Sequence, residues 1–196
     1  MLLCSGFQSL EKAFASDQTP STESVPSINA WIEGGKVFDN GTWLHPVLRL
    51  RTEDRVFGFA LVDGYRVNAS NPRNITITEG NYNYFLNLRV IPSSSSPEER
   101  IQTVFPDAEV TQRTTIASMG RNRPVLIAAW KPENCPLRQV IITHISTSAG
   151  VLEVTLTSRP ETFSEGQNLF NDFLSRAKSS EQGSTRFVPL KVPTHS

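Results

Sequence analysis

The chain has 196 residues, of which 38% are hydrophobic, and its 19 Lys and Arg residues balance 19 Asp and Glu residues. This composition is enough for one core with appendages, but no apolar run approaches the roughly 20 residues that a membrane-spanning helix needs. Net neutrality argues against nucleic acid as the main partner, because phosphate backbones reward basic surfaces. We therefore expect a globular protein with no transmembrane segment and no nucleic-acid partner.

Residues 1–27 have the composition of a signal-like or disordered segment. Ala13-Phe14-Ala15, which follows a short apolar start, has the Ala-x-Ala form of a signal-peptidase site. Residues 16–27 are rich in Ser, Thr, Pro and acids and carry too little apolar area to offset chain entropy. We expect cleavage after Ala15, with a true start upstream of Met1 as one explanation for the absent basic region, and an extracytoplasmic (periplasmic or secreted) location. The alternative is a frayed end of a cytoplasmic protein.

Residues 28–55 are predicted to form a β-hairpin extension that carries two tryptophans. Ala30–Glu33 and residues 36–38 flank Gly34-Gly35, a pair that tolerates the positive φ of hairpin turns. Trp31 and Trp43 would form a platform for a ligand or partner. Alternatively, they would cover one end of the main sheet, because buried aromatic side chains mostly contribute packing.

Residues 56–178 are predicted to form an α+β domain, in which an antiparallel sheet is flanked by two main helices at about 96–105 and 164–178. Short turns between the alternating apolar segments demand antiparallel neighbours. Residues 179–196 are expected to be a polar C-terminal tail. The predicted strands span residues 47–51, 55–61, 65–67, 75–78, 82–91, 110–119, 125–130, 140–147 and 151–157.

Both predicted helices carry start signals and an apolar stripe. Ser96 precedes Pro97, with Glu99 at the third helical position, which is a capping-box pattern. Ser164 and Gln167 repeat the pattern before the second helix. The apolar stripe of the second helix consists of Leu169, Phe170, Phe173, Leu174 and Ala177.

The clearest element is a hairpin of residues 140–147 and 151–157, joined at residues 148–150. Val154 and its neighbours at 152 and 156 share one face of the second strand. Glu153 lies on the other face, with Thr155 and Thr157. Such alternation predicts a strand with one face on a core and one face in water.

Several of these segments resemble the PsbP-like fold family. The residues that carry the resemblance are Phe57-Gly58-Phe59 leading into Asp63-Gly64-Tyr65-Arg66-Val67, the strand Tyr84–Ile91, the helix that begins at Ser96-Pro97, and the closing unit ending Asn171-Asp172-Phe173-Leu174. The family includes lumenal extrinsic proteins of photosystem II, a regulator of the GTPase Ran and bacterial lipoproteins. The resemblance covers roughly residues 56–178, although the family usually has Pro where this chain has Asp63. It implies a binding or assembly module, and it identifies no metal or partner residues.

Motifs that bind phosphates, metals or cofactors are absent from the sequence. The glycines form neither G-x-x-x-x-G-K nor G-x-G-x-x-G, and there is no G-x-S-x-G or H-E-x-x-H motif. Cys4 and Cys135 cannot make a cysteine-only zinc site. We therefore predict no catalytic residue, no metal ligand and no cofactor.

Two other groups of residues could carry chemistry. Cys135 and His144 could form a nucleophile–base pair. The alternative, which we favour because no motif places a third orienting group, is that His144 is a capped or solvated side chain. Arg121 and Arg123 are predicted to lie in a small basic loop, which either binds an acidic partner or is a plain solvated turn.

The leading hypothesis is a noncatalytic, exported binding or assembly module for a protein partner or small ligand. One alternative is a small hydrolase or transferase that uses Cys135 and His144. Another is a cytoplasmic regulator of a nucleotide-binding protein, which rests on fold analogy alone. Sequons at Asn40, Asn68 and Asn74 would be glycosylated in a eukaryotic secreted protein.

Overall fold

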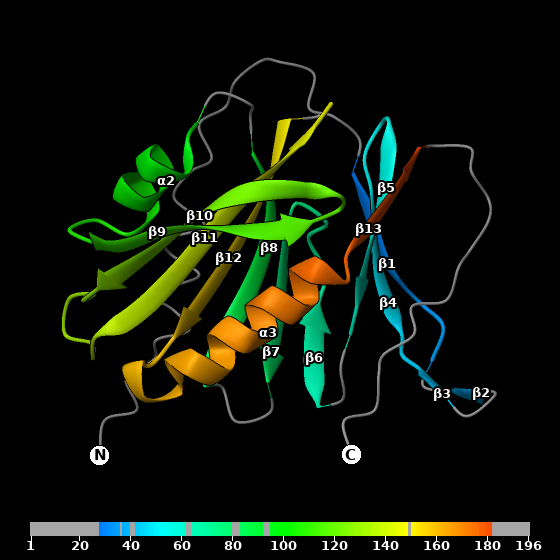
Figure 1. Cartoon of the computed structure of the whole chain (residues 1–196), viewed down its shortest axis with the longest axis horizontal. Helices are drawn as coiled ribbons and strands as arrows, with labels where there is room; N and C mark the ends of the chain where they lie inside the picture. Colours follow the sequence, from blue (N-terminus) through cyan, green and yellow to red (C-terminus); the bar gives the residue numbers. More distant parts are fainter. Residues whose placement is uncertain are drawn as a thin grey trace.

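The computed structural model describes residues 28–35, 37–39, 42–61, 64–79, 83–91, 95–148 and 150–181 (Figure 1). The predicted signal-like segment at residues 1–27, the sequon at Asn40 and the tail beyond residue 181 lie outside the described residues. The predicted α+β class with antiparallel strands and two main helices is confirmed. No helix among the described residues is long and apolar enough to cross a bilayer.

The largest element is a seven-stranded antiparallel sheet with the order β6-β7-β8-β12-β11-β10-β9. The hairpin predicted at residues 140–157 is confirmed as β11–β12, and β12 is the central strand. The strands are β6 (Tyr65–Asn68), β7 (Asn74–Glu79), β8 (Tyr84–Ile91), β9 (Glu109–Ser118), β10 (Arg121–Trp130), β11 (Arg138–Thr147) and β12 (Gly150–Ser158).

A second antiparallel sheet of four strands has the order β1-β4-β5-β13. Its strands are β1 (Asn29–Glu33), β4 (Val47–Arg51), β5 (Arg55–Ala60) and β13 (Lys178–Glu181). The prediction of a single sheet is therefore wrong, and so is the assignment of Lys178 to a helix. The sequence of β13 is polar and short, so alternation gives no sign of the strand; its place is set by pairing with β5.

The N-terminal hairpin is also formed differently from the prediction. β1 pairs with β4, with Ala30 opposite Leu50 and Ile32 opposite Leu48, and not with residues 36–38. Val37 and Phe38 belong instead to β2 (Val37–Asp39), which pairs with β3 (Thr42–Leu44). Gly34 has a positive φ of 75°, as expected for a turn residue. The strands before and after Gly34-Gly35, β1 and β2, do not pair with each other. Burial of Leu48 and Leu50 in the shared core favours the long-range pairing.

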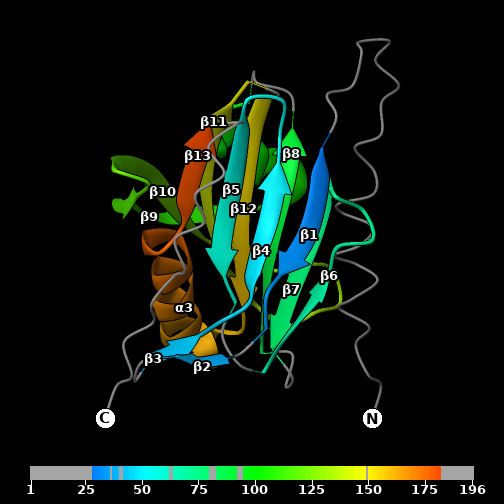
Figure 2. The ribbon, with the colours of Figure 1, turned by 90° about the vertical axis from the view of Figure 1, so that its right-hand side faces the viewer.

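The three layers of the molecule are the four-stranded sheet, the seven-stranded sheet and α2 (Pro97–Val104), as Figure 1 shows. Figure 2 looks onto the four-stranded sheet, with strands of the seven-stranded sheet behind it. The four-stranded sheet and α3 (Phe163–Ser175) both pack on the same face of the seven-stranded sheet. Phe59 of β5 stacks on Phe173 of α3, with ring centroids 4.8 Å apart. A separate apolar cluster under α2 contains Ile101, Val104, Phe105, Leu126, Trp130 and Ile142.

The helix starts confirm one predicted cap and contradict the other. The Ser96 side chain accepts from the Glu99 N–H, and the Glu99 carboxylate accepts from the Ser96 N–H, which completes the capping box of α2. α3 begins one residue earlier than predicted, at Phe163, and its N-cap Thr162 makes no side-chain cap. The 3-10 turn η1 (Pro160–Thr162) leads directly into α3, so Ser164 lies inside the helix.

Arg121 and Arg123, predicted to lie in a small basic loop, are instead part of β10. The turn between β9 and β10 consists of Met119 and Gly120, which both have positive φ, at 52° and 74°. This geometry fits a two-residue hairpin. Pro124 is tolerated in the strand because pairing between β10 and β11 begins only at the next residue, while its carbonyl accepts from the Thr143 hydroxyl at 2.7 Å.

Candidate functional site

An apolar pocket of about 160 Å³ lies between α3 and the neighbouring ends of both sheets. β5 and the residue after it supply Ala60 and Leu61, while β6, β7 and β8 each supply one side chain. The lining residues are Ala60, Leu61, Tyr65, Ile77, Leu86, Leu169, Asp172, Phe173 and Arg176. Pockets of this kind, mostly apolar with a few polar groups, are the usual form of small-molecule sites.

The sequence of α3 determines which side chains reach the pocket. Phe170 and Leu174 are fully buried in the core, and Phe173 is fixed by its stacking on Phe59. Gly166 lets the helix lie close to β12, because a Cβ there would approach the Leu156 side chain to 3.1 Å. Leu169, Asp172 and Arg176 follow at spacings of three and four residues, so they share the helix face that borders the pocket.

A charged pair stands among the pocket's lining residues. Arg176 donates from Nη2 to Asp172 Oδ2 at 3.1 Å, one helical turn apart. The Asp172 side chain is 61% exposed, whereas that of Arg176 is only 21% exposed. Arg176 is thus the more buried side chain of the pair, and Asp172 is the more exposed one.

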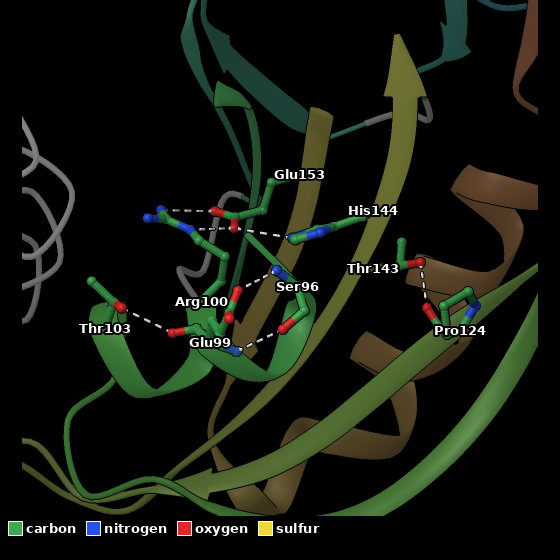
Figure 3. A network of polar contacts seen from close by, with 8 residues as sticks. All are labelled: Ser96, Glu99, Arg100, Thr103, Pro124, Thr143, His144 and Glu153. Carbon is green, nitrogen blue, oxygen red and sulfur yellow. Dashed lines mark hydrogen bonds and ion pairs between the residues drawn. The ribbon is translucent and has the colours of Figure 1, made fainter. Parts of the chain in front are cut away.

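Polar chemistry is concentrated elsewhere, in a buried network under α2 (Figure 3). Arg100 of α2 donates from Nε to Glu153 Oε2 at 2.9 Å and from Nη2 to Oε1 at 3.5 Å. His144 of β11 contacts the same carboxylate, with Nε2 3.4 Å from Oε2. The side chains of Arg100, Glu153 and His144 are 6%, 1% and 10% exposed.

Glu153 is charged in this network at neutral pH. Burial raises the pKa of Glu153, but hydrogen bonds from His144 and Arg100 and the Arg100 charge outweigh burial and bring the pKa below its usual value. The carboxylate is therefore committed to an ion pair. It is not poised near neutral pH, as a general acid or base would be.

The burial of Glu153 contradicts the prediction that one face of β12 lies in water. Every described position of β12 is buried, including Thr155 and Thr157 at 1% exposure. β12 is the central strand, so neighbours flank it on both sides, and Arg100 of α2 reaches its polar face. The alternation correctly assigns the residues of β12 to two faces, but the polar face is also buried in the protein.

The structure does not bring Cys135 and His144 together. Cys135 precedes β11, whereas His144 lies six residues beyond the first residue of that strand. At about 3.3 Å per residue, six residues of strand span roughly 20 Å. Within the described part of the chain, the polar side chain that contacts the His144 ring is Glu153.

The predicted binding residues lie in three different sheets: the four-stranded sheet, the β2–β3 pair and the seven-stranded sheet. Trp31 lies in β1, where the Arg51 guanidinium sits 5.2 Å from its ring centroid. Trp43 lies in β3, and its side chain is outside the described residues. Arg121 and Arg123 share one face of β10. The two tryptophans and the two arginines therefore do not form one site, and partner binding at any of them stays a prediction.

Like charges surround Arg123. Burial lowers the pKa of Arg123, and the nearby charges of Arg121 and Arg55 lower it further. Arg55 comes from the four-stranded sheet and the other two arginines from the seven-stranded sheet. The sequence alone does not predict that Arg55 lies close to Arg121 and Arg123, because these residues belong to different sheets.

The sequence analysis predicts a binding role for none of the pocket residues, although it assigns Leu169 and Phe173 to the apolar stripe of the helix. Asp172 and Arg176 look like an ordinary exposed pair at i and i+4. A usable signal is that Asp172 directly precedes Phe173, the centre of the apolar stripe, and that Arg176 follows Phe173 by three residues. Leu61 and Tyr65 gave no signal, because β5 and β6 belong to different sheets. Among the described residues, no group of three His, Cys, Asp or Glu side chains could hold a metal ion.

Comparisons with known proteins give a likeness to solved structures and none in sequence. No family model matches the chain, and no curated protein matches it in sequence. Among solved structures, the chain is similar to LpqN, which is described as involved in cell envelope biogenesis of Mycobacterium tuberculosis. The likeness has a TM-score of 0.45 at 13% sequence identity and covers 64% of this chain and 84% of that chain. The resemblance to the PsbP-like family stays a prediction.

Proposed function

We propose that the protein is a noncatalytic, exported binding module whose ligand occupies the pocket beside α3. The observation that carries this proposal is the pocket itself, which joins an apolar lining from five elements to one charged pair. A ligand with a small apolar body would remove apolar surface from water there, at about 25 cal/mol per Å².

The arrangement of reactive side chains favours binding over catalysis. Glu153 neutralises Arg100 and contacts His144 in the interior of the protein. Neither the pocket lining nor the network under α2 contains a cysteine, and the pocket lining contains no histidine. Nucleophilic catalysis requires a nucleophile and a base within hydrogen-bond reach.

Export is supported by the sequence of the N-terminal segment. Ala13-Phe14-Ala15 precedes a polar stretch of the kind found at mature N-termini. Mass spectrometry of the native protein should find Ser16 as the first residue, in an extracytoplasmic fraction. An intact cytoplasmic chain that retains residues 1–15 would contradict export and favour an intracellular regulator.

Binding can be tested with benzyl alcohol, a neutral probe whose ring fits the pocket volume. An apolar protein cavity of about 150 Å³ can bind benzene. We expect ligand-observed NMR on the full chain to give a dissociation constant on the order of 1 mM, equivalent to about −4 kcal/mol.

Two matched substitutions locate the site. Leu169→Trp should fill the pocket and weaken benzyl alcohol binding at least tenfold. Leu137→Trp makes the same exchange at a side chain that is 42% exposed and lies outside the pocket, so binding should be unchanged. Undetectable binding to the parent chain, or equal binding by both variants, would refute the proposed site.

A further inference from the structure

We propose that Arg176 recognises a carboxylate on the ligand, so that the pocket selects small carboxylic acids with an apolar body of about six carbon atoms. This inference rests on the proposed function and names the ligand class of the same pocket. Its basis is that the pocket lining is apolar except for Tyr65, Asp172 and Arg176. A ligand that buries an apolar body there must place its polar end near these three side chains.

Arg176 has donors to spare for a ligand. A guanidinium offers five N–H groups in a planar fork, which matches the two oxygens of a carboxylate. The bond to Asp172 engages Nη2. The Arg176 side chain is only 21% exposed, so a charge-assisted hydrogen bond there competes less with solvent than on an open surface.

Asp172 is a weak competitor for the guanidinium. Its side chain is 61% exposed, and exposed ion pairs contribute little because water and salt screen them. A ligand carboxylate can therefore share Arg176 with Asp172 or displace it. Repulsion between the ligand carboxylate and Asp172 would weaken binding. We therefore predict that removing the charge of Asp172 tightens anion binding.

The burial of the two charges also favours an anionic over a cationic ligand. An amine at the end of an apolar body would meet Arg176 first, since Arg176 is the more buried of the pair. The carboxylate available to such an amine is that of Asp172, whose exposed side chain offers only a screened ion pair. The pocket volume of about 160 Å³ limits the apolar body to about the size of benzene.

The test compares benzoate, benzyl alcohol and benzylamine, which share one ring and differ in the charge of the polar end. Dissociation constants are measured by NMR on the full chain at low ionic strength and neutral pH. We expect benzoate to bind about tenfold more tightly than benzyl alcohol, and benzylamine to bind more weakly than both. Equal affinities for benzoate and benzyl alcohol would overturn the inference and leave the proposed binding function intact. No binding of any probe would overturn both.

Two substitutions at the charged pair should act in opposite directions. Arg176→Gln should remove the advantage of benzoate, so that the ratio of the benzyl alcohol to the benzoate dissociation constant falls from about ten to about one. Asp172→Asn should tighten benzoate binding severalfold. A matched charge control is Arg113→Gln, because Arg113 pairs with Glu98 of α2 and is 66% exposed. An effect of Arg113→Gln on benzoate equal to that of Arg176→Gln would show a general charge effect and would overturn the inference.

Discussion

One face of the seven-stranded sheet packs against the four-stranded sheet and α3, whereas the other packs against α2. On the first face, β12 contributes Leu152, Val154 and Leu156 to a continuous apolar core. On the second face, the same strand contributes buried Glu153, which is held by Arg100 and His144. The alternation in the sequence of β12 therefore predicts which residues share a face. It does not predict that the polar face is buried.

The two faces differ in what holds them together. Apolar burial is nondirectional and scales with area. A buried ion pair depends on the presence of both partners, since loss of one leaves an uncompensated charge. The pocket beside α3 lies on the apolar side, whereas α2 is held on the other face by the charged network together with the apolar cluster beneath it.

The largest expected effect is on the apolar face. Phe173→Ala should destabilise the protein by roughly 3–5 kcal/mol, because it leaves a cavity and removes the stacking partner of Phe59. Chemical denaturation with the parent and variant chains measures the difference. An unchanged free energy of unfolding would contradict the packing of α3 on this sheet.

On the charged face, Arg100→Met should cost about 3 kcal/mol, because it leaves Glu153 buried without its cation. The double variant Arg100→Met/Glu153→Gln should recover much of that loss, because it also removes the buried charge. Equal stability of the single and double variants would show that the two side chains are not coupled.

Acid should weaken the charged face selectively. The pKa of Glu153 is lower in the folded protein than its ordinary value of 4.5. Its contribution to stability is therefore complete above about pH 4.5 and is lost as pH falls through the folded-state pKa, with a slope of at most about 1.4 kcal/mol per pH unit for one proton. Unfolding curves of the parent and of Glu153→Gln should converge in acid; a constant difference at all pH values would refute this linkage.

The cap of α2 offers a smaller perturbation of the same face. Ser96→Ala removes the side-chain acceptor of the Glu99 N–H and should cost about 1 kcal/mol. Ser164→Ala is a control at a serine that does not cap its helix, and it should change stability much less. Equal losses in the two variants would contradict the assignment of the caps.

The smallest effect is expected at the arginines of β10. Arg121→Gln relieves repulsion on Arg123, so it should raise the melting temperature slightly at low ionic strength. The gain should vanish near 1 M salt, where the Debye length is about 3 Å. Arg159→Gln, at an exposed arginine outside this cluster, should show no such salt-dependent gain.

Local signals in the sequence predicted local structure well. The β11–β12 hairpin, the capping box at Ser96 and the buried stripe around Phe170 follow from alternation, capping chemistry and helical spacing, and all are confirmed. Long-range pairing was predicted less well. β1 pairs with β4 across Gly34-Gly35, because register depends on the core that both strands share.

The candidate site depends on those long-range relations. Leu61 and Leu169 are more than a hundred positions apart in the printed sequence, and they line one pocket only because α3 packs beside the four-stranded sheet. The burial of Glu153 likewise depends on Arg100, which lies 53 residues away. Neither relation leaves a periodic mark in the sequence.

The most direct test of ligand binding on the apolar face is a methyl NMR titration of the full chain with benzyl alcohol. We predict saturable shifts of the methyl groups of Leu61, Ile77, Leu86 and Leu169, while those of Ile101 and Ile142 under α2 stay unchanged. Shifts confined to Ile101 and Ile142, or no saturable shift at any methyl group, would contradict a ligand site beside α3.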